Sequence, residues 1–139
     1  MTDAADLRTP LGEEVLSLQA GDRVTISGVV YTARDEAHLR MLKEGIPFDS
    51  RGAVVYHCGP VVAGERIIAA GPTTSARMDG MTGFLLDAGV RGIIGKGGMG
   101  SEVVGSATVV SDSGTVCGLS TYPPWAKIRQ GRTSAMTTR

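Results

Sequence analysis

Three cationic side chains follow predicted strands closely enough to act on one anion. Arg34, Arg77 and Lys96 each lie within a few residues of the C-terminal end of an apolar, β-branched run. In open α/β sheets ligands bind outside the carboxyl ends of the strands, so the three cations could converge there. A guanidinium binds a carboxylate through two parallel hydrogen bonds. The alternative is that each is an ordinary solvated charge at a helix start or a turn.

The segment GPTTS (71–75) adds hydroxyl groups beside this predicted site. Its amides and hydroxyls precede a predicted helix, where unpaired N–H groups favour an anion. Thr73 and Thr74 are therefore candidate ligands for the same anion, although Thr74 or Ser75 could simply cap the helix. The segment GKGGMG (95–100) resembles a dinucleotide fingerprint only weakly, because no acidic residue follows Asp112 to bind a ribose.

Histidine and cysteine are too few and too scattered for a metal site. The chain has two histidines and two cysteines, without a CxxC pair. Two cysteines cannot supply the three or four thiolates of an iron–sulfur cluster, so we expect no metal on this chain. His57 and Cys58 fit a buried strand better than a ligand set. His38 lies one helical turn after Arg34 and could face either the site or the core.

The order of elements indicates an α/β domain. Strands alternate with helices along the first hundred residues, and we expect a single layer-packed domain. A capping pattern places Thr32 at the start of the first long helix, with Asp35 three residues later. A short helix after Pro10 should precede these elements, and weaker strands follow near 108–110 and 116–119. The predicted strands are 23–31, 53–58, 66–70 and 92–95, and the predicted long helices are 33–44 and 76–88.

Length and charge narrow the function further. A chain of 139 residues suits one domain, which we place at 21–125 after an N-terminal segment, 1–20. Residues 126–139 have little to bury and are expected to form a disordered basic tail. The net charge is zero, so no overall field favours nucleic acid or a membrane surface. With no signal peptide and no long apolar run, we expect a cytoplasmic protein.

Four blocks in this order resemble the C-terminal domain of class I fumarases, also found as the β subunit of two-chain fumarases and L(+)-tartrate dehydratases. They are YTARDEAH (31–38), VYHCGP (55–60), GPTTSARMD (71–79) and IIGKGG (93–98). The resemblance implies a swivelling β/β/α domain and a hydro-lyase acting on fumarate and malate or on tartrate. It also implies an α subunit that carries a [4Fe–4S] cluster, and hence a hetero-oligomer.

The same resemblance assigns roles to individual residues. Arg34 and Arg77 would hold the substrate carboxylates, and Lys96 would bind substrate and contribute to catalysis. Thr73 would take part in proton transfer at carbon, whereas Thr74 remains a candidate substrate ligand only by its place in the hydroxyl-rich segment. Residues 105–139 do not resemble the family, which suggests a short or truncated C-terminal part. A non-catalytic relative that binds small organic anions or a partner protein is therefore the alternative.

Overall fold

The computed structural model describes one α/β domain, as the sequence predicts. Its described residues are 5–18, 23–64, 66–71, 73–95, 108–111, 116–117, 120–122 and 127–138. Within them, ten strands form one sheet with the order β1-β2-β3-β6-β7-β10-β9-β5-β4, and β8 pairs with β10. No helix in this part of the chain is long and apolar enough to cross a membrane.

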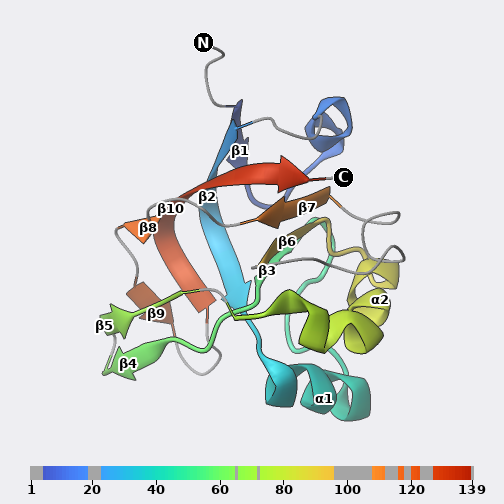
Figure 1. The fold of residues 1–139 in the computed structure, drawn as a ribbon, viewed down its shortest axis with the longest axis vertical. Helices are drawn as coiled ribbons and strands as arrows, with labels where there is room; N and C mark the ends of the chain where they lie inside the picture. The colour runs from blue at the N-terminus through green and yellow to red at the C-terminus, as the bar shows by residue number, and fades with distance from the viewer. Residues whose placement is uncertain are drawn as a thin grey trace.

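The first half of the sheet is parallel and carries the predicted site. Its five strands pair side by side, and the register aligns Tyr31 of β2 with Val55 of β3, and Val55 with Ile93 of β6. The carboxyl ends of β2, β3 and β6 therefore meet at one edge (Figure 1). These strands are β1 (Ala5–Arg8), β2 (Arg23–Thr32), β3 (Val54–Tyr56), β6 (Gly92–Gly95) and β7 (Thr108–Ser111).

The remaining strands pair antiparallel. β4 and β5 form a hairpin, and β10 pairs with β2, β7, β8 and β9. Because β10 pairs with both β7 and β2, the strands β2, β3, β6, β7 and β10 form a closed ring of pairings. Figure 1 shows β10 lying over β2. These strands are β4 (Val61–Ala63), β5 (Arg66–Ala69), β8 (Val116–Cys117), β9 (Ser120–Tyr122) and β10 (Lys127–Thr138).

The alternating side chains of the parallel strands build two apolar clusters, one on each face. On one face, Val54 and Tyr56 of β3 pack with Ile26 of β2. On the other face, Val55 and Ile93 pack with residues of the helices. Figure 1 shows both helices, α1 (Asp35–Glu44) and α2 (Asp79–Asp87), on the same side of the sheet. β3 is buried on both faces, because the helices cover one face and the first apolar cluster packs against the other.

The first long helix begins later than its capping pattern predicts. β2 continues through Thr32, so the residue before α1 is Arg34, and no side chain caps the helix. The prediction that Thr32 is the cap was therefore wrong, because that residue remains paired in the sheet. The helix ends as expected at Gly45, whose φ of 91° suits glycine.

The second helical segment has two parts. Residues Ser75–Met78 form a 3₁₀ turn, η2, which leads directly into α2. The predicted strand at 66–70 is present as β5, but its hairpin partner β4 was not among the predicted strands. Val61, Val62 and Ile68 of this hairpin are exposed.

Both ends of the described chain take part in the sheet. Residues Ala5–Arg8 pair with β2, and the expected helix after Pro10 is the short 3₁₀ turn η1 (Glu13–Ser17). Leu7, Leu11 and Val15 are buried in the main core. The tail that we expected to be disordered, 126–139, instead contains β10 at Lys127–Thr138. Apolar content alone did not reveal this strand, because it is fixed by backbone hydrogen bonds to four other strands.

Candidate anion site at the carboxyl ends of the parallel strands

Arg34 lies at the carboxyl end of β2, against the segment that follows β3. It is exposed, and it is the residue from which α1 begins. Its side chain passes over Gly59, where an added Cβ would overlap Arg34 Cδ and lie 3.4 Å from Cγ and Nη1. Glycine at this position therefore leaves the space that the arginine side chain occupies.

Arg77 forms an ion pair with Asp35, the residue that follows Arg34 in the sequence. Its Nη2 donates a hydrogen bond to Asp35 Oδ2 at 2.8 Å, across 42 residues of sequence. Burial tends to raise the pKa of Asp35, but its own backbone N–H and the charges of Arg77 and Arg34 together hold that pKa below its usual value. The hydrogen bond from Arg77 therefore joins the η2 turn to Asp35, the first residue of α1, and Arg34 directly precedes that residue at this edge.

The hydroxyl-rich segment is held at the end of β3. Thr73 N–H donates to the carbonyl oxygen of His57 at 2.7 Å, and the Thr73 side chain is partly exposed. Thr74 is exposed beside it. The structure thus brings the segments of Arg34, Thr73 and Arg77 to one edge of the sheet. Lys96 lies outside the described residues, and its predicted roles stay predictions, as do those of the other four.

Two histidines are buried beneath this edge. The exposed fractions of His38 and His57 are 0% and 1%, and their ring centroids lie 5.3 Å apart. Burial lowers the pKa of His57 to about 4, and the His38 ring acts in the same direction. Burial also lowers the pKa of His38, against the opposing effects of the Arg34 carbonyl group and the Asp35 carboxylate. Both imidazoles are therefore neutral near pH 7, and the prediction that His57 is a core residue is confirmed.

The described residues do not fit an iron–sulfur cluster or another metal. Cys58 is buried next to His57, and Cys117 follows in β8 far along the sequence. In the ranges that the structure describes, no three His, Cys, Asp or Glu side chains gather in a way that could hold a metal ion.

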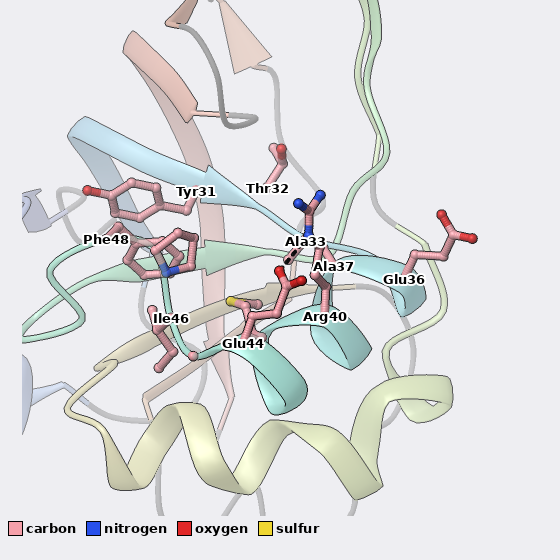
Figure 2. Close-up of a pocket in the computed structure, with 12 residues that line it drawn as sticks. Tyr31, Thr32, Ala33, Glu36, Ala37, Arg40, Glu44, Ile46 and Phe48 are labelled. Carbon is pink, nitrogen blue, oxygen red and sulfur yellow. Dashed lines mark hydrogen bonds and ion pairs between the residues drawn. The ribbon is translucent and has the colours of Figure 1, made fainter.

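A separate cavity of about 500 Å³ lies on the other side of α1. Tyr31 and Phe48 stack there with ring centroids 3.8 Å apart, and Arg40 pairs with Glu44 at 2.9 Å (Figure 2). The residues of α1 that line the cavity are 36, 37, 40, 41 and 44. Their spacing places them on one face of the helix, and Asp35 lies on another face. Of the four predicted site residues that the structure describes, none lines this cavity.

Sequence reasoning missed two contributors to the strand-end arrangement. Asp35 was interpreted only through the capping pattern, yet it binds Arg77. Gly59 appeared only within the block at 55–60, with no role of its own, yet it makes room for Arg34. The sequence offered a reason to consider Asp35, because this residue directly follows Arg34, a predicted site cation. No signal in a single sequence could have shown which side chain crosses Gly59.

The fold and this edge define a small α/β domain that presents cationic side chains beyond the carboxyl ends of parallel strands. The family described as the fumarase C-terminus matches residues 2–115, and the chain belongs to that family. This confirms the resemblance stated from the four sequence blocks.

Named relatives agree with this membership. The L(+)-tartrate dehydratase subunit beta of Escherichia coli K12 is 38% identical over 102 residues, covering 68% of this chain and 51% of that protein. A protein of Geobacillus stearothermophilus named "Putative fumarate hydratase class I" is 39% identical over 105 residues, covering 70% of this chain and 20% of that protein. The chain thus spans about half the length of the β-subunit relatives and a fifth of the fumarate hydratase.

Proposed function

We propose that this chain is the β subunit of an iron–sulfur hydro-lyase that reversibly adds water to, or removes it from, a small dicarboxylate. The substrate would be fumarate and malate, or tartrate. The observation that carries the proposal is the 2.8 Å hydrogen bond from Arg77 Nη2 to Asp35 Oδ2, which joins the turn that bears Arg77 to the helix that begins after Arg34. Family membership and the names of the relatives support the same reaction class.

The residues of this chain would supply binding and charge stabilisation. Removing a proton next to a carboxylate places negative charge on that carboxylate, and a guanidinium stabilises such charge through preorganised, charge-assisted hydrogen bonds. The Asp35 bond engages Nη2 of Arg77, which leaves other N–H donors of this guanidinium for a substrate carboxylate. Lys96 would add a third cation.

Thr73 would act at the substrate carbon. A threonine hydroxyl is a poor base by itself, so it needs an ionised neighbour that accepts its proton. We propose that the α subunit supplies this neighbour and carries a [4Fe–4S] cluster, which would serve as a Lewis acid for the leaving hydroxyl group. The chain alone should therefore be inactive, and the working enzyme should be a hetero-oligomer.

Reconstitution with the cognate α subunit tests the proposal. The two chains together should dehydrate malate or tartrate, whereas neither should do so separately. Arg34→Met and Arg77→Met should each cost about 2–4 kcal/mol of transition-state stabilisation, or roughly 30- to 900-fold in kcat/KM. Arg40→Met is the matched control, since Arg40 is also an exposed, ion-paired arginine of this region but lines the separate cavity.

Two results would contradict the proposal. Dehydration by this chain without a partner would remove the need for the α subunit. Wild-type kinetics in both Arg34→Met and Arg77→Met would remove these residues from the substrate site. Dicarboxylate binding without turnover in the assembled pair would instead favour the non-catalytic relative.

A further inference from the structure

The mechanism proposed above uses neither of the two histidines, although both are fully buried. His38 comes from α1 and His57 follows β3, and their rings meet edge to face at an interplanar angle of 64°. The Nε2 atoms of both rings have no hydrogen-bond partner within the described residues. Burying an imidazole with only one of its two ring nitrogens hydrogen-bonded costs free energy. The hydrogen bonds that the two rings do make therefore indicate their role.

The hydrogen bond of His38 fixes its tautomer. Its Nδ1 lies 2.7 Å from the carbonyl oxygen of Arg34, and a carbonyl can only accept. His38 must therefore carry hydrogen on Nδ1, and its neutral Nε2 is an acceptor. The same carbonyl also accepts the backbone N–H of His38 at 3.0 Å, so the ring adds a second bond to the residue that carries a site guanidinium.

His57 holds the other two segments of the site. Its Nδ1 lies 2.9 Å from the hydroxyl oxygen of Ser75, the first residue of the turn that bears Arg77. Its backbone carbonyl accepts the N–H of Thr73, and its backbone N–H donates to Ile94 of β6 at 2.8 Å. One residue thus connects the threonine segment, the arginine turn and the neighbouring strand.

We infer that His38 and His57 are a pair of positioning residues, which set the relative placement of Arg34, Thr73 and Arg77 through direct hydrogen bonds and ring contact. This inference rests on the proposed function. Neither ring reaches the protein surface, so neither is a catalytic residue. Because α1 and η2 are joined elsewhere by the exposed ion pair of Asp35 and Arg77, the buried rings provide the water-free part of this connection.

A pair of amide substitutions at position 38 tests the inference in the assembled enzyme. His38→Asn places an amide donor where Nδ1 stands, whereas His38→Gln places it near Nε2. We expect His38→Asn to keep the KM for the dicarboxylate within about threefold of wild type. His38→Gln should raise this KM at least tenfold with a smaller change in kcat, because a displaced arginine weakens ground-state and transition-state binding alike. Equal KM values in the two variants, both folded by thermal unfolding, would overturn the inference.

Nuclear magnetic resonance of the ¹⁵N-labelled full chain provides a readout that does not depend on activity. The sequence contains two histidines, so only two ring systems give signals. At pH 7.5 we expect His38 to be neutral with hydrogen on Nδ1, and His38→Gln to shift the amide signals of Thr73 and Arg77. A charged His38, or one with hydrogen on Nε2, would overturn the inference even if the variants fold poorly.

The kinetic and the nuclear magnetic resonance experiments also distinguish a failure of this inference from a failure of the proposed function. If the wild-type pair of chains shows no hydro-lyase activity, the proposed function fails, and the ring tautomer and amide shifts still decide the positioning role. If activity is present but the two amide variants behave alike, the positioning role fails and the proposed function stands.

Discussion

Gly59→Ala should displace Arg34 without destabilising the fold. An added Cβ would overlap Arg34 Cδ and come within 3.4 Å of Cγ and Nη1, so the side chain must rotate away. The φ of Gly59 lies outside the left-handed region, so alanine can adopt this backbone. Gly→Ala at such a position tends to stabilise a protein by about 0.4–1 kcal/mol, because alanine lowers the conformational entropy of the unfolded chain. The substitution should therefore separate substrate binding from stability.

The expected loss follows from the contact that Arg34 would make with a carboxylate. A hydrogen bond to a charged group is worth roughly 1.5–3 kcal/mol, which corresponds to about 10- to 150-fold in affinity. Because the arginine side chain is flexible and can partly recover the contact, we expect the lower end, about a tenfold rise in KM. Kinetics of the enzyme assembled with its α subunit measure this change, and thermal unfolding of the same preparation measures stability.

Gly80→Ala provides the matched control. A Cβ at Gly80 would meet nothing within 4 Å, and the residue lies in α2 rather than at the strand ends. We expect an unchanged KM and a helix stabilised by about 0.5–1 kcal/mol. If Gly59→Ala leaves KM at the wild-type value, or if it lowers the unfolding temperature markedly, the reasoning about the Arg34 side chain is refuted.

Two further predictions concern charges. Asp35→Asn should raise the KM several-fold with little effect on the unfolding temperature, because Arg77 loses an exposed ion pair that orients it; a lower KM would show that Asp35 competes with substrate. The free energy of unfolding should fall by on the order of 3 kcal/mol between pH 6.5 and pH 4. His57 has a pKa of about 4 when folded and 6.5 when unfolded, so the unfolded chain binds the proton first as the pH falls. Urea unfolding at pH 6.5 and pH 4 measures this loss, and an equal loss in His57→Asn would contradict it.

The parallel core of the fold was predictable from the sequence. Local hydrophobic patterns predict two strands, at 23–31 and 92–95, and a helix near 33–44. The structure contains all three. Parallel pairing then brings the carboxyl ends together. For this reason the shared edge of Arg34 and Arg77 could be anticipated from residues far apart in sequence.

Contacts between distant backbone segments were not predictable in the same way. β4 and β10 are defined by pairing with other strands, and neither has an apolar alternation strong enough to indicate it alone. The roles of His38 and Ser75 depend on which rings and hydroxyls face each other across the core. A single sequence specifies the residue types at these positions but not their partners.

The pairing of β10 with β2 also bears on how the protein is synthesised. The paired residues, such as Lys127 with Tyr31 and Met136 with Arg23, are separated by roughly a hundred residues, and such non-local pairing slows folding. During translation, β2 must wait for β10 to leave the ribosome, with one strand edge uncovered. That edge offers unpaired backbone groups to other nascent chains, so chaperones that shield extended segments should matter more for this protein than for helical domains of equal length.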